Sequence, residues 1–424
     1  MKNIFLLSAL LLVFASCTKD QDTILESPDK RLNSLLAEYQ AQLVDPELGW
    51  IGYLLTGTEK VHVFNMSFNK DNRVVMTSDY AKAAAESSYI VRALQKPTLI
   101  FDTYSTIHII NDPTSSISGG ALGKGQVTDF EFQFIKASKD TIELEGVLNK
   151  SKFFLIRAKN QTELDNSYNN TSQEIAKAYS DIQTYFKRVN IGGIECEVNL
   201  NTANKRFTLK YLEGEDLITK NVNYFSVGNR LRFFESIKLG NQEIAGLSDF
   251  NYDATKAALV STSFDGKEFL IKEETKPLKY EIGAAKAWYN WAKAISYASA
   301  YSPFQVDGSA DGLGLLSLGG YRRLDFAPAT TAGASDFARI FATTNYGVGL
   351  KTTIDDNGIA VFSFMEDRGT IPAAARTVYD NYVKQYTQPQ GYYIIMTNNS
   401  TRNAEKVFDM VSVSDAKDWV TWAY

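Results

Sequence analysis

The chain has few of the residues on which most metal and nucleophile chemistry depends. Its 424 residues include two cysteines, Cys17 and Cys196, and two histidines, His62 and His108. A disulfide framework and a Cys–His metal cluster are therefore excluded, and no HExxH or GxSxG motif occurs. Each histidine lies among apolar neighbours in a segment that alternates like a strand, so we interpret both as core residues. If both point into one barrel, they could instead bind a metal or a porphyrin together.

The chain also lacks a net positive charge and a second long apolar run. Its net charge is -5 and its pI is near 5.4, which argues against nucleic acid as a partner. Beyond the N-terminus, no apolar run approaches the roughly 20 residues that a transmembrane helix needs. The 23 tyrosines and 25 phenylalanines favour β structure. We therefore expect a β-rich body outside the bilayer.

One of the two cysteines occupies the position that carries lipid in bacterial lipoproteins. Lys2 is followed by an apolar run, Ile4–Phe14, and by the small residues Ala15-Ser16 directly before Cys17. This pattern predicts a signal peptide over residues 1–16. Because cysteine is the first mature residue, we predict cleavage by signal peptidase II and lipidation of Cys17, which gives stable membrane anchoring. An ordinary signal peptide that happens to contain cysteine is the alternative.

Changes in hydrophobic period divide the mature chain into a tether and three folded parts. Residues 17–30 are polar and predict a flexible lipidated tether. Residues 31–160 open with a helix and continue as eight or nine short alternating strands, a meander typical of lipocalin-like barrels. Residues 171–275 repeat this order, with an amphipathic helix predicted over 175–186 and a second antiparallel segment. Residues 276–424 contain segments with helical periodicity and segments that alternate like strands. The whole chain is therefore predicted to be α+β and β-rich.

A glycine-rich loop interrupts the first meander. It lies between strands predicted at Thr106–Ile110 and Asp129–Phe134. The segment Gly119–Gly125 resembles a phosphate-binding loop, but its spacing is one residue short. Gly125 also stands where Ser or Thr would hold Mg²⁺. We predict a mobile loop beside a barrel mouth instead.

A second loop matches the first half of a calcium-binding loop. Asp307, Ser309 and Asp311 stand at ligand positions, and Gly312 stands where the sharp turn needs glycine. Leu318 occupies the position that requires a bidentate acid. We interpret the segment as an acidic turn, with a weak surface calcium site as the alternative. No other cofactor is predicted.

Two pairs of acids lie on predicted strands. Asp129 and Glu131 alternate with phenylalanines, and Glu143 and Glu145 alternate with apolar residues. Such alternation predicts solvated outer faces rather than the facing carboxylates of a glycosidase.

The tryptophans and the second cysteine are the remaining candidates for functional residues. Trp288 and Trp291 share a helical stripe that we expect in a core, which leaves Trp419 and Trp422 as freer candidates for stacking on sugar rings. Cys196 alternates with apolar residues and lies between two glutamates. It is therefore predicted to be a buried, unreactive thiol.

Several motifs resemble a family of Bacteroidota surface lipoproteins of unknown function. They are Gly49–Tyr53, Ser88-Tyr89, Pro97–Tyr104 with His108 and Asp112-Pro113, and the glycine-rich loop followed by Asp129–Phe132. The resemblance covers most of residues 30–260. It implies a gene position beside SusC/SusD-like uptake systems, often with a zinc metallohydrolase lipoprotein, and it supplies no catalytic residues. Lys19–Asp22 also resembles the signal that sends such lipoproteins to the cell surface.

These observations together predict a non-catalytic lipoprotein of the outer membrane, exposed at the cell surface. We expect it to capture a glycan or a peptide for a TonB-dependent, SusC/SusD-like transporter. An interaction subunit of that transporter without a small ligand of its own is the alternative. A hydrolase with a non-standard site is a third interpretation.

Overall fold

The computed structural model describes residues 27–169, 173–398 and 400–424. Contacts divide the chain into two compact units. The first holds residues up to Thr58 together with His62–Leu164, and the second holds Glu59–Val61 and Asp165–Tyr424. No described helix combines the length and the apolar character needed to cross a membrane.

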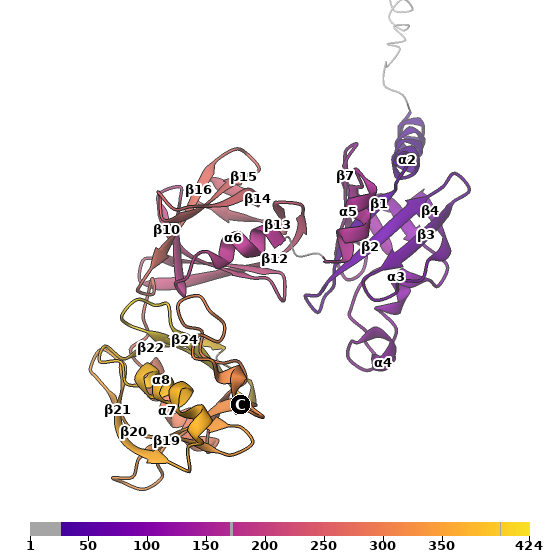
Figure 1. The fold of residues 1–424 in the computed structure, drawn as a ribbon. Coiled ribbons are helices and arrows are strands. Elements are labelled where there is room, and N and C mark those ends of the chain that lie inside the picture. Colours follow the sequence, from indigo (N-terminus) through magenta and orange to yellow (C-terminus); the bar gives the residue numbers. More distant parts are fainter. Residues whose placement is uncertain (1–26, 170–172, 399) are drawn as a thin grey trace, which may run out of the picture. The chain divides into compact units, whose positions relative to one another are not determined.

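The first unit is a closed barrel of eight antiparallel strands in chain order (Figure 1). The strands are β1 (Trp50–Leu55), β2 (Val61–Phe68), β3 (Arg73–Ser78), β4 (Ala85–Ala93), β5 (Pro97–Phe101), β6 (Glu131–Ala137), β7 (Thr141–Gly146) and β8 (Lys152–Arg157). Pairing of β1 with β8 closes the ring. The barrel-like, β-rich α+β fold predicted from the alternating segments is confirmed.

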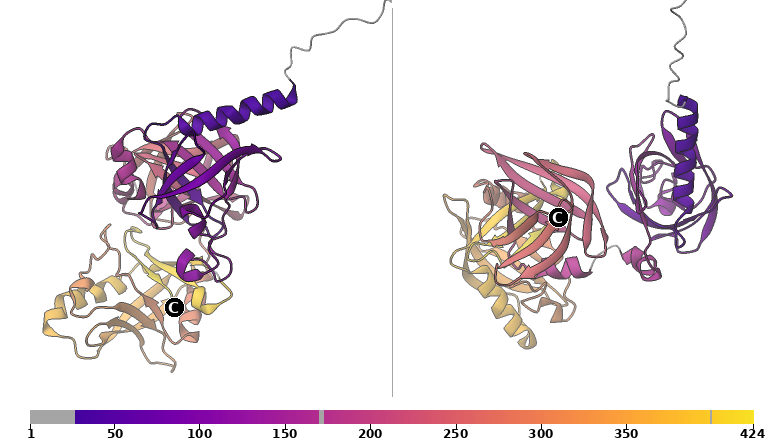
Figure 2. Two further views of the ribbon diagram at one scale, coloured as in Figure 1. Left: turned by 90° about the vertical axis from the view of Figure 1, so that its right-hand side faces the viewer. Right: turned by 90° about the horizontal axis from the view of Figure 1, so that it is seen from above.

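The helix α2 (Pro28–Val44) lies against this barrel (Figure 2). Proline in its first turn and Ser27 at its N-cap fix where it starts. The Tyr39 ring stacks on Phe134 with ring centroids 4.1 Å apart. Trp50 Nε1 donates to the Leu43 carbonyl at 2.9 Å. The predicted helix-then-barrel order of this part is therefore observed.

The segment between β5 and β6 is helical where we predicted a strand. It contains α3 (Thr106–Ile109) and α4 (Ser115–Ser118). Ser105 caps α3, and its backbone N–H donates to His108 Nδ1 at 3.2 Å. The buried residues Ile107 and Ile110 are three positions apart, as a helical turn requires. The local cap thus overrides the apparent alternation.

The second unit begins with another closed eight-stranded antiparallel barrel. The first unit ends within α5 (Gln161–Asn166), and the short helix η1 (Ser167–Asn169) and α6 (Gln173–Ser180) follow it. The strands of the second barrel are β9 (Phe186–Ile191), β10 (Ile194–Asn201), β11 (Arg206–Glu213), β12 (Asp216–Val227), β13 (Arg230–Leu239), β14 (Gln242–Asp253), β15 (Ala258–Ser263) and β16 (Glu268–Glu274). The predicted helix over 175–186 was too long, because it ends at Ser180 and Phe186 starts β9. Pairing of β16 with β9 closes this barrel.

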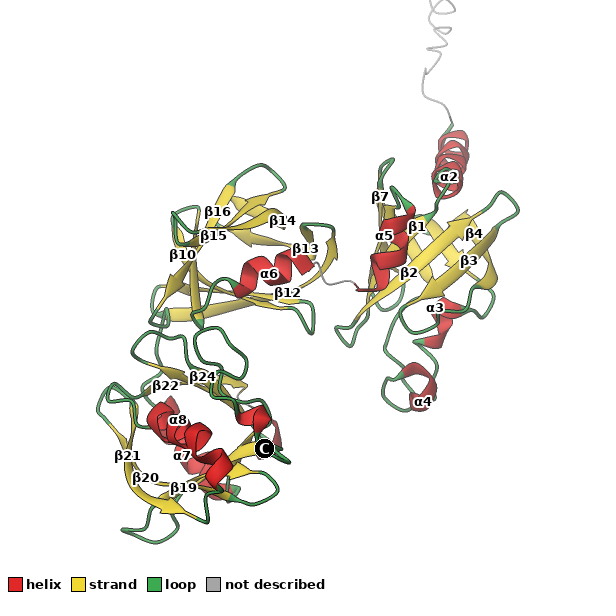
Figure 3. Cartoon of the chain, viewed as in Figure 1, coloured by secondary structure: helices red, strands yellow, loops and turns green. Residues whose placement is uncertain are grey.

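The rest of the second unit is an eight-stranded antiparallel sheet with two longer helices (Figure 3). Its elements are α7 (Ala284–Ala294), β17 (Ala298–Ala300), η2 (Leu315–Ser317), β18 (Arg323–Ala327), β19 (Asp336–Phe341), β20 (Tyr346–Ile354), β21 (Ala360–Arg368), η3 (Ala373–Ala375), α8 (Arg376–Tyr386), β22 (Tyr392–Asn398), η4 (Asn403–Glu405), β23 (Val407–Ser412) and β24 (Trp419–Trp422). A bridge between Ser299 and Ala423 joins the first and last strands. Aromatic side chains of the helices, among them Trp288 and Tyr386, fill the core against the sheet.

A small apolar cluster joins this sheet to the second barrel. It contains the buried residues Phe186, Tyr393, Val411 and Ala416. The Tyr185 backbone N–H donates to the Ala416 carbonyl at 2.7 Å, and its hydroxyl lies 2.6 Å from a carboxylate oxygen of Asp409. The start of β9 is therefore fixed against the turn between β23 and β24.

Candidate functional site

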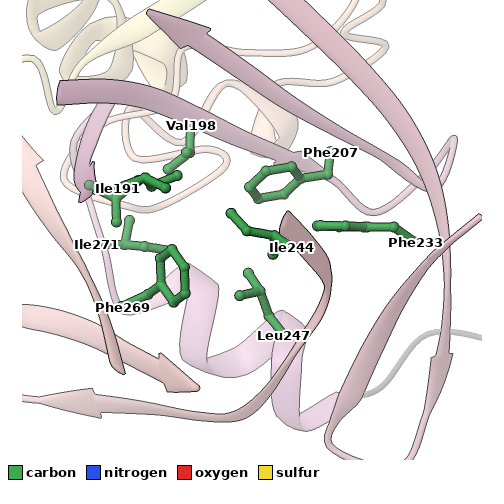
Figure 4. A pocket seen from close by; sticks show the side chains of 9 residues that line it. Ile191, Val198, Phe207, Phe233, Ile244, Leu247, Phe269 and Ile271 are labelled. Carbon is green, nitrogen blue, oxygen red and sulfur yellow. The ribbon is translucent and has the colours of Figure 1, made fainter. Parts of the chain in front are cut away.

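A small cavity inside the second barrel is lined by apolar side chains only (Figure 4). The lining residues are Val189, Ile191, Val198, Phe207, Phe233, Ile244, Leu247, Phe269 and Ile271. The cavity between them is about 10 Å³, close to the space that a single water occupies. The interior of this barrel is consequently packed with side chains and does not enclose a ligand-sized cavity as a lipocalin barrel does.

A much larger cavity of about 460 Å³ lies where the same barrel meets the turn between β23 and β24. Every residue that lines it carries a polar group: Ser180, Asp181, Gln183, Tyr252, Glu273 and Lys417. Ser180 ends α6, and Asp181 and Gln183 follow in the loop to β9. Tyr252 and Glu273 stand near the ends of β14 and β16, and Lys417 lies in the β23–β24 turn.

Gln183 connects the two sides of this polar cavity. Its backbone N–H donates to Glu273 Oε1 at 2.7 Å, and its side-chain Oε1 accepts from Lys417 Nζ at 3.1 Å. The backbone N–H of Lys417 donates to Asp415, which orders the turn. The cavity therefore offers carboxylate acceptors, an ammonium donor and a carboxamide whose positions are set by strand ends and an ordered turn.

A buried lysine stands next to Glu273 in the barrel wall. Lys187 pairs with Glu273 across β9 and β16 and is 5 % exposed. Its Nζ donates to the Thr184 carbonyl at 2.6 Å and lies 5.0 Å from the centre of the Tyr179 ring. Burial lowers the pKa of Lys187 to about 8, against the opposing effect of the Glu273 and Glu197 carboxylates.

The acidic turn predicted as a possible calcium site borders this cavity. A Cβ on Gly308 would lie 3.1 Å from Cγ of Gln183. The two carboxylate oxygens of Asp311 accept from the backbone N–H groups of Leu315 and Leu316, at 2.7 and 2.9 Å. Asp311 thus caps the short helix η2.

The backbones of Val306 and Ser309 pair within the same turn, and Asp307 has a positive φ of 49°. These contacts account for the turn as a structural element. Within the described ranges, no three His, Cys, Asp or Glu side chains cluster as a metal site would require. Calcium binding by Asp307, Ser309 and Asp311 remains a prediction.

The two histidines belong to separate networks in the first unit. His62 Nε2 lies 2.7 Å from Gln126 Oε1, and its Nδ1 lies 3.2 Å from Asp79. His108 lies on α3, not on a strand as predicted, and stacks on Phe130 at 4.3 Å. Burial lowers the pKa of His108. The two imidazoles therefore do not share a metal or porphyrin site in this structure.

Two other candidates have structural roles. Cys196 is buried as predicted, and burial together with Glu195 raises the pKa of its thiol to about 11. The prediction that Asp129 is solvated was wrong, because it is 4 % exposed and its oxygens accept from the Leu148 backbone N–H at 2.8 Å and the Ser151 hydroxyl at 2.7 Å. This carboxylate fixes the β7–β8 turn rather than facing solvent.

The prediction that two tryptophans are free to stack on sugars was wrong for Trp422, whereas Trp419 is only partly buried. Trp422 is completely buried, and Trp419 packs edge-to-face against Tyr185 with centroids 5.7 Å apart. Trp422 belongs to the core between the C-terminal sheet and its helices, and Trp419 packs against the cluster that joins this sheet to the second barrel. Trp288 and Trp291 are core residues, as their helical spacing predicted.

Cys17 lies outside the described residues, so its lipidation stays a prediction. Sequence reasoning missed every residue that lines the polar cavity. They are spread between positions 180 and 417 and form no motif with a fixed spacing. Only closure of the barrel and docking of the C-terminal sheet bring them together.

Among solved structures, the likenesses are distant. The DNA polymerase III β chain of Streptococcus pneumoniae is 10% identical over 93% of this chain and 97% of that chain, with a TM-score of 0.13. A protein of unknown function from the DUF3598 family of Nostoc punctiforme is 11% identical over 55% and 96% of the two chains, with a TM-score of 0.14. Scores of this size carry no argument about function.

No curated protein matches the chain. A family described as a domain of unknown function, DUF4302, matches residues 20–253. Because this match covers more than half of the sequence, the chain belongs to the DUF4302 family.

Proposed function

We propose that this protein is a non-catalytic, lipid-anchored binding protein that holds a polar ligand, a glycan or a peptide, in the cavity beside Gln183. The proposal rests on the difference in volume and in lining residues between the two cavities of the second unit. The polar cavity has about 460 Å³, whereas the barrel interior has about 10 Å³. Small-molecule sites typically fall between 300 and 1,000 Å³.

The lining groups match a ligand that both donates and accepts hydrogen bonds. Asp181 and Glu273 offer acceptors, Lys417 offers donors, and the Gln183 carboxamide offers both. Sugar hydroxyls and peptide amides need this mixture. No histidine is among the lining residues, so the Ser180 hydroxyl has no imidazole base there to activate it.

A calorimetric panel tests the ligand. The full-length protein, purified in detergent, is titrated with oligosaccharides and with short peptides. We expect one class to bind, and we expect a Glu273→Gln/Lys417→Met double variant to bind it at least about tenfold more weakly. Lys293→Met removes an exposed lysine of the same unit that does not line the cavity, and it should bind like the wild type.

Three results would contradict the assignment. If nothing in either class binds, the protein is not a receptor for these ligands. If a ligand binds and the double variant holds it as tightly as the wild type, the site lies elsewhere. Turnover of any ligand that is lost in Glu273→Gln would favour a hydrolase instead.

The cellular part of the proposal rests on the N-terminal sequence. A lipid on Cys17, followed by Lys19–Asp22, supports a position at the outer-membrane surface beside a SusC/SusD-like, TonB-dependent transporter that would take over the ligand. Cys17→Ala should retain residues 1–16 and take up no labelled palmitate, because the cleavage depends on prior acylation. Cys196→Ala is the matched control and should be labelled normally. Processing and labelling of the Cys17→Ala protein would refute the anchor.

A further inference from the structure

The outer face of the C-terminal sheet carries a row of arginines and aromatic rings. Strand alternation sends Leu324 and Phe326 of β18 into the core, so Arg323 and Asp325 point to the other side. The register places Arg323 opposite Phe341 of β19. This face lies beyond the residues that match the DUF4302 family and shares no residue with the polar cavity.

Guanidinium groups and rings are in close contact along this row. Arg323 lies 4.5 Å from the centre of the Phe341 ring, and Arg339 lies 5.5 Å from it. Arg339 also lies 5.6 Å from the ring of Tyr297. We call the set the arginine–aromatic strip; its members are Tyr297, Arg323, Phe337, Arg339, Phe341 and Arg368.

A buried carboxylate anchors the centre of the strip. Asp325 is 0 % exposed and accepts from Arg323 Nε at 2.7 Å, from Arg339 Nε at 3.0 Å and from the Ser299 hydroxyl at 2.9 Å. One carboxylate therefore orients two guanidinium groups. Both arginine side chains remain partly exposed, at 22% and 25%. Their planes are pre-organised, which reduces the entropy lost when they bind a partner.

Two glycines let the strip extend across β20. Gly347 is paired with Arg339 on one side and with Arg368 on the other, and Gly349 lies between Phe337 and Glu366. A Cβ on Gly349 would lie 2.7 Å from Cγ of Glu366. Because β20 places no side chain here, Arg368 reaches across it to within 4.7 Å of the centre of the Phe337 ring.

The strip is positively charged within an acidic protein. With the flanking Arg322, whose guanidinium lies 5.8 Å from the centre of the Phe341 ring, four arginines face two carboxylates, Asp325 and Glu366. The chain as a whole has a net charge of -5. This local excess of positive charge would attract an anionic partner and repel a second copy of the same strip.

We propose that the arginine–aromatic strip docks a protein segment rich in aspartate and glutamate. Arginine and aromatic side chains are enriched at the centres of protein–protein interfaces. Oriented guanidinium groups suit the planar carboxylates of such a segment.

Binding of synthetic peptides to the full-length protein tests this docking surface. A fluorescent peptide rich in Asp and Glu is compared with a peptide in which Asn and Gln replace these residues. The variants are Arg322→Gln/Arg368→Gln, which leaves the partners of Asp325 in place, and the control Arg402→Gln, whose side chain is 80% exposed outside the strip. Arg323 and Arg339 are left unchanged, because their loss would strand a buried charge.

The acidic peptide should bind more tightly than its amide counterpart, and rising salt should weaken it. The double variant should bind about tenfold more weakly, with Arg402→Gln unchanged. Equal binding of the two peptides, absence of binding, or an unaffected double variant would overturn the proposal. Binding of polygalacturonate or of anionic phosphatidylglycerol vesicles, but not of the acidic peptide, would also overturn the choice of a protein partner.

Discussion

The small apolar cavity inside the second barrel and the polar cavity beside it differ sharply, although β14 and β16 contribute residues to both. Phe269 and Ile271 of β16 line the apolar interior, and Glu273, the next residue on the same side of the strand, lines the polar cavity. On the paired strand β9, Lys187 precedes Val189 and Ile191 on the same side of the strand and lies opposite Glu273. The inward row thus changes from apolar to charged at one end of the barrel. The apolar and the charged residues of this row therefore occupy different stretches of the same strands.

The largest expected effect concerns stability without binding. Phe207→Ala removes a ring that lines the barrel interior and lies 5.1 Å from the Phe233 ring. The free energy of unfolding of the second unit should fall by about 3–5 kcal/mol, because the barrel cannot fully collapse around the lost ring. Denaturant titration measures this. Leu316→Ala, at a residue that is 63 % exposed, should change it by less than about 0.5 kcal/mol.

The next effect concerns the charged end of the barrel. The pKa of Lys187 is lowered to about 8 from 10.5, so between these pH values the unfolded chain binds more protons than the folded one. Stability therefore rises with pH across this window, and Lys187 contributes at most about 3 kcal/mol to the rise. Lys187→Met should lack this contribution.

Unfolding titrations of the wild type and Lys187→Met at pH 7.5 and pH 10 measure the difference. Comparing the two proteins removes the contribution of other groups that titrate in both. An identical pH dependence would show that Lys187 is not buried in the barrel wall. It would contradict the change from apolar to charged residues along the inward side of β9.

A smaller effect concerns the rim of the polar cavity. Gly308 has a φ of 78°, and its Cβ position lies 3.1 Å from Cγ of Gln183. Gly308→Ala should cost about 1–2 kcal/mol of stability, because an L-residue is strained in the left-handed region. It should also weaken ligand binding by displacing Gln183. Gly333→Ala, at φ 80° with no neighbour near its Cβ position, should cost similar stability but leave ligand affinity unchanged.

The barrels could be predicted from the sequence, whereas the polar cavity could not, and the reason is physical. Alternation over Val61–Phe68 predicts a strand because each side chain packs on its own side of the sheet. The error at Thr106–Ile110 arose because so short an apolar segment can form either a strand or a helical turn, and the Ser105 cap decides in favour of the helix. Glu273 and Lys417 meet through barrel closure and sheet docking, which are long-range events that no local pattern encodes.

Calorimetric comparison of two conservative variants tests most directly whether the ligand binds at the end of the barrel rather than inside it. Glu273→Gln removes one charge from the polar cavity, and Phe207→Leu reshapes the apolar interior. We predict that ligand affinity falls at least about tenfold in Glu273→Gln and is unchanged in Phe207→Leu. Loss of affinity in Phe207→Leu with full affinity in Glu273→Gln would place the ligand inside the barrel and contradict the account.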